Sequence, residues 1–296
     1  MTRSLAPDDG RLSHRLQDMT LRGVLWGLRR LPYGTRLALM GRVMARVVGP
    51  LSGYRARAEA NLALIRPELT ATERRERARQ VCDNFGRTLI ENYSHVEFGA
   101  RLSGTTPEGP GVAALEEAVS QGRPVIFVTG HFGNFEAPRH VLTQRGLTIG
   151  GLYRPMANPQ IDAHYRETMT SWGGPVFAQG SRGTMGFARH LKSGGLGTLL
   201  FDVMVHEGVP IPFLGRDAMT SLSAAEMAVR FDAAMIPYFG IRQADGVSFR
   251  VEVDAPIPHG PPDEMMRAAT ARLEARIERH PEQWFWVHRR WKQSKR

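Results

Sequence analysis

The segment from residue 124 to residue 144 decides how this chain folds at its centre. It begins with Pro124-Val-Ile-Phe-Val-Thr-Gly130, continues with His131-Phe-Gly-Asn-Phe-Glu136 and runs on to Gln144. The first part is short, apolar and β-branched, which is typical of a buried strand. Residues 134–144 have helix-forming character, so the sequence predicts a strand, a turn and a helix. His131 and Glu136 then flank the carboxyl end of the strand, the edge at which open α/β sheets bind ligands.

His131 and Glu136 have the chemistry of an acid–base pair. A histidine at this edge can take a proton from a hydroxyl group, and a carboxylate five residues later can hold its imidazole in the reactive tautomer. The same spacing recurs at His259 and Glu264, but that pair lies in a proline-rich stretch with no strand before it. We therefore interpret the second pair as part of a solvated loop and predict that His131 is the base and Glu136 its orienting partner.

The segment Thr129-Gly-His-Phe-Gly-Asn-Phe-Glu136 resembles the His-x-x-x-x-acid block of the lipid A late (secondary) acyltransferases, a family of the glycerolipid and lysophospholipid acyltransferase superfamily. The likeness covers roughly residues 30–292. Further matching segments occur in the expected order: Asn84-Phe-Gly-Arg-Thr-Leu89, Tyr153-Arg-Pro155 with Asn158-Pro159, Gly208-Val-Pro-Ile-Pro-Phe-Leu-Gly-Arg216, Ala234-Met-Ile-Pro-Tyr238 and Pro281-Glu-Gln-Trp-Phe-Trp-Val-His-Arg-Arg-Trp-Lys292.

This resemblance implies an O-acyltransferase. It would move a fatty acyl chain from an acyl-carrier protein or CoA thioester to a hydroxyl of a lipid A precursor, with no cofactor beyond that co-substrate. Direct attack by the acceptor is expected, because the chain has no Gly-x-Ser-x-Gly elbow to supply a covalent nucleophile. Another glycolipid or a lysophospholipid stays open as the acceptor. The alternative to an enzyme is a lipid-binding relative without catalytic activity.

Further residues are candidates for substrate binding. Gly133 and Asn134 would expose peptide N–H groups to an oxyanion or a phosphate at the helix start, although Gly133 could instead serve only the turn. The resemblance places a substrate-binding arginine at Arg154, and Arg182 opens the next predicted helix but one. Asp202 ends a predicted strand at the same sheet edge; the family commonly has Asp-Gln there, where this chain has Asp202-Val203.

Strand and helix signals alternate along the rest of the chain. This predicts an α/β fold with a mostly parallel mixed sheet covered by helices on both faces, in one acyltransferase domain spanning residues 1–296. Thr70 and Glu73 form a capping box that opens a long helix. Later strands are expected at residues 148–153, 175–178, 197–202, 235–241 and 248–253, and helices at residues 159–172, 181–192, 224–231 and 263–279.

The chain is basic, with a net charge of +10, and its basic residues are almost all arginine. Positive charge gathers at both ends, which favours an anionic membrane surface or an acyl-carrier protein as a partner. Residues 14–54 are expected to form amphipathic, membrane-associating helices, because arginine interrupts every apolar run and no spanning helix fits. The stripe Leu37, Met40, Met44, Val47 would face the lipid, or else pack on the protein's own core. We expect peripheral or monotopic attachment to the cytoplasmic face of an inner membrane.

Other classes find little support. No nucleic-acid motif, P-loop or dinucleotide fingerprint occurs, and no second histidine lies near His131 in the sequence to make a zinc site. The single Cys82 excludes an internal disulfide, and we expect it to pack in a helix. Two segments have two interpretations each: residues 209–214 line an acyl groove or form a core-facing loop, and residues 284–291 lie at a membrane surface or pack in the interior.

Overall fold

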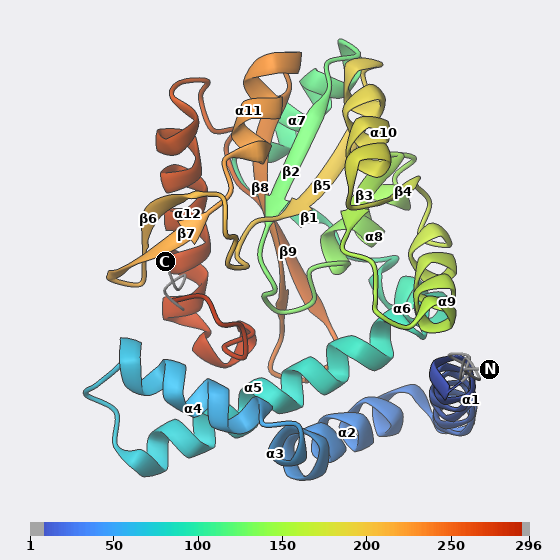
Figure 1. Cartoon of the computed structure of the whole chain (residues 1–296). Helices are drawn as coiled ribbons and strands as arrows, with labels where there is room; N and C mark the ends of the chain where they lie inside the picture. Colours follow the sequence, from blue (N-terminus) through green and yellow to red (C-terminus); the bar gives the residue numbers. More distant parts are fainter. Residues whose placement is uncertain (1–8, 292–296) are drawn as a thin grey trace, which may run out of the picture.

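The strand predicted at the centre of the chain is present as β2 (Val125–Thr129), and it lies in the middle of the main sheet. The structure is a computed structural model that describes residues 9–291. Within these residues the main sheet has seven strands in the order β1-β9-β8-β2-β5-β3-β4 (Figure 1). The other six are β1 (Pro107–Glu108), β3 (Ile149–Tyr153), β4 (Val176–Ala178), β5 (Leu196–Leu200), β8 (Ala234–Arg242) and β9 (Phe249–Val253).

Most neighbouring strands run parallel, as predicted. β2 pairs in parallel with both β5 and β8, and β3 pairs in parallel with β5 and β4. The exception is the predicted hairpin of β8 with β9, which is antiparallel; the short β1 runs beside β9 in the same direction. The carboxyl ends of β2, β5, β3 and β4 therefore share one edge of the sheet.

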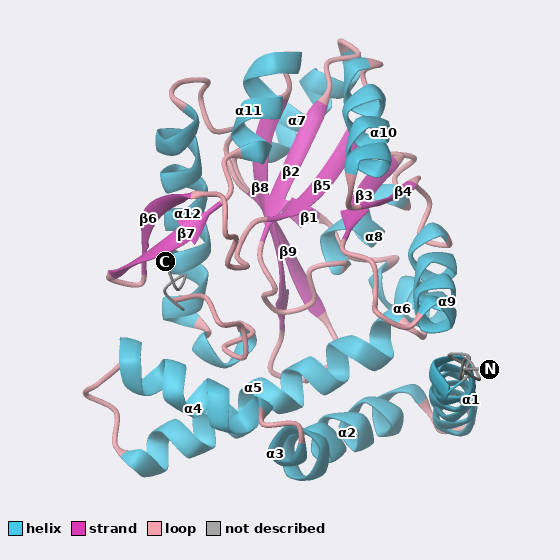
Figure 2. Cartoon of the chain, viewed as in Figure 1, coloured by secondary structure: helices cyan, strands magenta, loops and turns pink. Residues whose placement is uncertain are grey.

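Helices cover both faces of this sheet (Figure 2). Side chains alternate along β2, so Ile126 and Val128 pack with α10, α11 and α12, whereas Val125 and Phe127 pack with α7 and α8. This confirms the predicted layered α/β fold. The helices of the sheet region are α6 (His95–Leu102), α7 (Gly111–Ser120), α8 (Ala137–Thr143), α9 (Pro159–Thr170), α10 (Ser181–Lys192), α11 (Ser223–Phe231) and α12 (Pro262–Arg279).

The N-terminal helices form a separate layer next to the sheet, at the bottom of Figure 1. The longest is α5, where Thr70 accepts from the peptide N–H of Glu73 and the Glu73 carboxylate accepts in return from that of Thr70, the predicted capping box. The layer consists of α1 (Asp9–Arg29), α2 (Tyr33–Val43), a π-helical turn (Met44–Val48), α3 (Gly49–Leu51), α4 (Tyr54–Ile65) and α5 (Ala71–Asn92).

The predicted lipid-facing stripe on α2 points inward for the most part. Leu37 and Met44 are 0% and 4% exposed, and Met40 is half-buried against the same neighbours, while Val47 alone is half-exposed. Of the two interpretations, packing on the protein's own core is therefore the correct one for most of the stripe, because α2 and the π-helical turn that carries Met44 and Val47 pack along α5. Cys82 of α5 is buried beside Met44, which confirms its expected packing role.

Two ambiguous segments belong to the interior. Residues 209–214 form most of an antiparallel hairpin, β6 (Val209–Phe213) with β7 (Arg216–Thr220), whose Ile211 and Phe213 are buried in the main core. Trp284 and Trp286 are fully buried after a 3-10 turn at Pro281–Gln283, and so is Arg290. The core interpretation of both segments is thus the correct one. Among residues 9–291, no helix combines the length and apolar character needed to cross a bilayer.

Candidate active site

His131 and Asp202 stand side by side because their strands pair in register. β2 and β5 are parallel neighbours in which Thr129 lies opposite Leu200. His131 and Asp202 each follow two residues later, so both side chains leave the same edge of the sheet. The peptide N–H of Phe201 donates to the carbonyl of Thr129 at 3.1 Å, which holds the two chain segments together beyond the strands.

The buried Asp202 carboxylate accepts three hydrogen bonds, two of them from His131. Its Oδ1 accepts from Nδ1 of His131 at 2.8 Å, and its Oδ2 accepts from the peptide N–H of His131 at 2.7 Å and from the indole N–H of Trp284 at 2.9 Å. An ionised carboxylate has no proton to donate, so Nδ1 of His131 carries a proton, and in the neutral form of the ring Nε2 then keeps its lone pair. This is the tautomer that a general base needs.

Asp202 stays ionised in spite of its burial. Burial alone would raise the pKa of its carboxyl, but the charge of His131 and the hydrogen bonds from that residue outweigh burial and hold the pKa well below its ordinary value, with a smaller contribution from His288. A carboxyl whose pKa is lower in the folded state stabilises the fold above its unfolded pKa, and this stabilisation is lost as the pH falls. The contact is therefore intact at neutral pH.

Glu136 does not make the expected contact with His131. Its side chain is buried and lies 3.6 Å from the guanidinium of Arg139, and its Oε2 has no hydrogen-bond partner among the described residues. Burial raises the pKa of the Glu136 carboxyl, against the positive charges of Arg139 and, more weakly, His131. The carboxylate that contacts the imidazole is Asp202 and not Glu136, because the turn after His131 is not helical and α8 begins only after Glu136.

Gly133 and Asn134 build the turn and leave no group free for a substrate. The peptide N–H of Gly133 donates to the carbonyl of Gln283 at 2.9 Å, and the peptide N–H of Asn134 donates to that of Gly240 at 3.2 Å. Gly133 has a φ of +56°, and a Cβ there would meet the carbonyl oxygen of Gly240 at 1.9 Å, so the position needs glycine. The expected anion-binding role of these two residues is corrected to a structural one.

The side chain of Asn134 completes a buried network behind this turn. Its amide N–H groups donate to Glu91 at 2.9 Å and to Asn92 at 3.1 Å, and its oxygen accepts from the peptide N–H of Glu136 at 3.0 Å. Glu91 also receives Arg242, whose Nη2 donates at 2.7 Å. This network ties the turn to α5 and β8, so the position of His131 is fixed from behind as well as by Asp202.

Arg154 and Arg182 lie further along the same sheet edge. Arg154 directly follows β3, and Arg182 is in the first turn of α10, after β4. The sheet order places β3 next to β5, on the side away from β2, and β4 beyond β3 at the edge of the sheet. Both side chains are exposed and pair with no carboxylate among the described residues. The structure thus leaves both predicted arginines exposed and without an ion-pair partner among residues 9–291.

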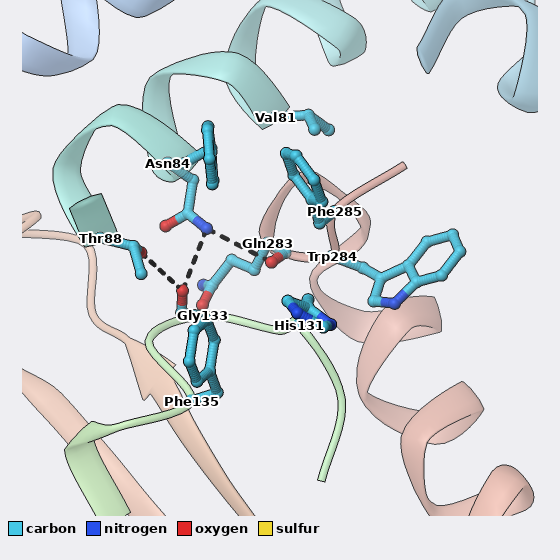
Figure 3. A pocket seen from close by; sticks show the side chains of 10 residues that line it. Val81, Asn84, Thr88, His131, Gly133, Phe135, Gln283, Trp284 and Phe285 are labelled. Atoms are coloured by element: carbon cyan, nitrogen blue, oxygen red, sulfur yellow. Dashed lines mark hydrogen bonds between the residues drawn. The ribbon is translucent and has the colours of Figure 1, made fainter. Parts of the chain in front are cut away.

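A small, mostly apolar pocket opens next to His131 (Figure 3). Val81 and Phe85 of α5 line it together with Phe285, whose ring centre lies 4.4 Å from that of Phe85, and Phe135 lines the opposite end. Asn84 and Thr88 of α5 donate to the carbonyl oxygen of Gly133 at 3.3 and 2.8 Å, which fastens the turn to the pocket wall. The pocket therefore brings an apolar surface directly to the base.

Sequence reasoning missed one residue of this site altogether. The ring of His288 lies 4.5 Å from that of His131, centre to centre, at an interplanar angle of 72°. One ring nitrogen from each histidine and one oxygen of Asp202 lie within 4.8 Å of one another, a grouping that could hold a metal ion. However, both oxygens of Asp202 already accept hydrogen bonds, which favours acid–base chemistry. The sequence signal that could have identified His288 is its place in residues 281–292, a segment that matches the family.

The comparisons with known proteins identify the family of this chain. The family model described as "Bacterial lipid A biosynthesis acyltransferase" matches residues 13–293. A lipid A biosynthesis acyltransferase of Haemophilus influenzae is 24% identical over 266 residues, covering 86% of this chain and 81% of the relative. In Escherichia coli, a lipid A biosynthesis lauroyltransferase and a palmitoleoyltransferase are 24% and 26% identical, each match covering 91% of this chain and 89% of the relative. The chain is an acyltransferase and belongs to the bacterial lipid A biosynthesis acyltransferase family.

Proposed function

We propose that this enzyme transfers a fatty acyl chain from an acyl-carrier protein thioester to a hydroxyl of a lipid A precursor by direct attack. Nε2 of His131 takes the proton of the acceptor hydroxyl as its oxygen attacks the thioester carbonyl. Asp202 holds the ring and stabilises the imidazolium that forms. When the tetrahedral intermediate collapses, the C–S bond breaks and the leaving thiolate takes the proton from His131.

The observation that carries this proposal is the contact between Asp202 and Nδ1 of His131 at the carboxyl edge of the sheet. It leaves the outer nitrogen of a half-exposed ring unprotonated, beside an apolar pocket. An apolar wall next to the base suits the alkyl end of an acyl thioester. Glu136 supports the site in this account through its charge and its contact with Arg139, without contacting His131.

The test is transfer of a labelled acyl chain by the purified full-length protein. Acyl-carrier protein and CoA thioesters of one chain length are offered as donors, with a lipid A precursor or a lysophospholipid as the acceptor. We expect transfer to the lipid A precursor, with the carrier protein as the better donor. Transfer to the lysophospholipid alone would contradict the acceptor, and a preference for CoA would contradict the donor.

Arg154 and Arg182 are proposed to bind an anionic group of a substrate, either a lipid A phosphate or the phosphate of the carrier's prosthetic arm. Arginine binds phosphate through two parallel N–H donors. We expect Arg154→Ala and Arg182→Ala each to raise KM roughly tenfold, since a hydrogen bond to a charged group contributes about 1.5–3 kcal/mol. The value of kcat should change little.

Arg189 provides the control for this experiment. It is exposed on the same helix as Arg182, near the opposite end of α10. Arg189→Ala should leave KM unchanged. Measuring KM separately for the donor and the acceptor shows whether the arginines bind the phosphate of the carrier's prosthetic arm or that of the lipid. Equal KM values for all three variants and the wild-type protein would show that the two arginines are ordinary surface residues.

The membrane surface is proposed to bind α1 instead of α2. The outward face of α1 carries exposed apolar side chains at the spacing i, i+4, i+7 and i+14, and arginines lie along its edge. On the opposite face, Asp18 and Leu25 are buried toward the protein. The exposed stripe is Leu12, Leu16, Met19 and Trp26, and the flanking arginines are Arg15, Arg22 and Arg29. An amphipathic helix of this kind lies in the headgroup plane of an anionic leaflet.

This surface predicts a two-component attachment. Each basic residue near an anionic surface contributes about 1 kcal/mol, screened over roughly 8 Å at physiological salt, whereas the apolar stripe is insensitive to salt. In flotation with phosphatidylglycerol vesicles, high salt should release part of the protein. The double variant Met19→Asp, Trp26→Asp should release nearly all of it.

Val96→Asp is the control for position, since Val96 is 65% exposed on α6. It tests whether a negative charge at any exposed apolar residue releases the protein from vesicles. That variant should float like the wild-type protein. Retention of the α1 variant on vesicles would place the membrane surface elsewhere, and retention of wild type at both high salt and alkaline pH would mean that the chain inserts into the bilayer.

A further inference from the structure

His288 lies at the reaction site although it belongs to the C-terminal part of the chain, far from His131 in the sequence. It follows the 3-10 turn after α12 and packs edge-on against the ring of His131, and the ring of Phe285 also contacts it, with the two ring centres 4.8 Å apart. Its peptide N–H donates to the carbonyl of Phe285 at 3.2 Å, and Trp284 beside it donates to Asp202. The chain segment that carries His288 is therefore fixed to the same carboxylate that fixes His131.

The ring of His288 has an unused polar atom. Its Nε2 is buried and has no hydrogen-bond partner among the described residues. Leaving a buried polar group unpaired costs about 1–3 kcal/mol, so such an atom calls for an explanation. Burial lowers the pKa of His288 to about 3, with a further contribution from the charge of His131 and opposition from Asp202. The ring is thus neutral at physiological pH and keeps one N–H donor.

The attack on a thioester creates a negative oxygen that needs donors. The sequence analysis expected these donors to be the peptide N–H groups of Gly133 and Asn134. In the structure, all four peptide N–H groups of residues 131–134 already donate, to Asp202 or to backbone carbonyls. The amide of Asn134 is used as well. The donor has to come from another segment, and it must lie about 2.7–3.1 Å from the developing oxyanion.

We infer that His288 is a further catalytic residue, whose Nε2–H donates to the oxyanion of the tetrahedral intermediate while His131 holds the acceptor's proton. This inference rests on the proposed acyl transfer. One ring nitrogen of His288 lies within 4.8 Å of one ring nitrogen of His131. In the tetrahedral intermediate the acceptor oxygen and the former carbonyl oxygen are bonded to the same carbon, so one can face each histidine. The carbonyl electron pair moves onto that oxygen in the attack and returns as the C–S bond breaks.

Three substitutions separate this role from packing. His288→Phe keeps an aromatic ring against His131 but has no N–H group. His288→Gln places an amide N–H close to the position of Nε2, and His288→Asn places it close to that of Nδ1. We expect His288→Phe to lose about 10²–10³-fold in kcat, the usual cost of one oxyanion donor. His288→Gln should recover a large part of that loss, and His288→Asn should not.

The pH dependence and the stability of the variants complete the test. If His288 only supported His131, its loss would move the acidic limb of the kcat/KM profile, because that limb follows the base. We expect the profile of His288→Phe to keep its position and to fall in height, with an unchanged Tm. Near-normal kcat in His288→Phe, equal activity of the Gln and Asn variants, or a shifted limb would overturn the inference. A wild-type protein that transfers no acyl chain would instead contradict the proposed function.

Discussion

His131→Ala should lower kcat by about 10²–10⁴-fold while the protein keeps its fold. In this mechanism the imidazole of His131 is the general base, and removing a general base typically lowers the rate by this factor. Truncation leaves the peptide N–H of His131 in place to bond Asp202, so the turn should survive. Single-turnover transfer of a labelled acyl chain measures the chemical step, and a thermal unfolding curve checks the fold.

His259 is the matched control. Its Nε2 lies 2.9 Å from the carbonyl oxygen of Ala233, just before β8 begins and so at the opposite edge of the sheet. His259→Ala should therefore transfer acyl chains at a nearly normal rate. If His131→Ala were as active as His259→Ala, the base would have to be sought among other residues of the site.

The local part of the site could be predicted from the sequence because it depends on neighbours in the chain. The apolar run of β2 and the glycines after it specify a strand followed by a turn, and these place His131 at the carboxyl edge. Asp202 was likewise predicted at this edge, from the strand that precedes it. Their contact could not be predicted, because it requires β2 and β5 to pair with Thr129 opposite Leu200, across 71 residues of chain.

The error over Glu136 has a physical origin in the turn. The expectation required the helix to begin near Asn134, but the left-handed Gly133 and a bridge between Phe132 and Trp284 delay its start. Glu136 is consequently buried next to Arg139, three residues later. A pattern of residue types predicts which groups share a region, whereas the backbone angles of one glycine decide which of two carboxylates reaches the imidazole.

Two segments for which lipid contact was one of two interpretations, the stripe that begins on α2 and residues 284–291, pack in the interior for a common reason. An amphipathic stripe of apolar residues and arginines is the same pattern whether lipid or protein covers it. On α2 the cover is α5, and near the C-terminus it is the core, where Arg290 donates to the carbonyl of Met219 and to the hydroxyl of Thr220. Composition does not report these partners, since they come from strands far away in the sequence.

Asp202→Asn should lower kcat by about 10³–10⁴-fold, because it reverses the tautomer of His131. The oxygen of the new amide would stay with the two donors that now meet Oδ2, the peptide N–H of His131 and the indole of Trp284. The amide NH₂ group would then face Nδ1 of His131, which could only accept. The proton would move to Nε2, and the ring could no longer take a proton from the acceptor hydroxyl.

Glu136→Gln is the comparison that separates the two carboxylates. It removes a buried charge at a similar depth without touching the tautomer of His131, so its loss in kcat should be clearly smaller than that of Asp202→Asn. ¹⁵N NMR of labelled histidine reads the tautomer directly: Nε2 of His131 should be protonated in Asp202→Asn and unprotonated in both the wild-type protein and Glu136→Gln. A larger loss of kcat in Glu136→Gln, with kcat of Asp202→Asn close to normal, would restore Glu136 as the partner of the base despite its distance from the ring. The contact between Asp202 and His131 would then serve only to hold β2 and β5 together at their carboxyl ends.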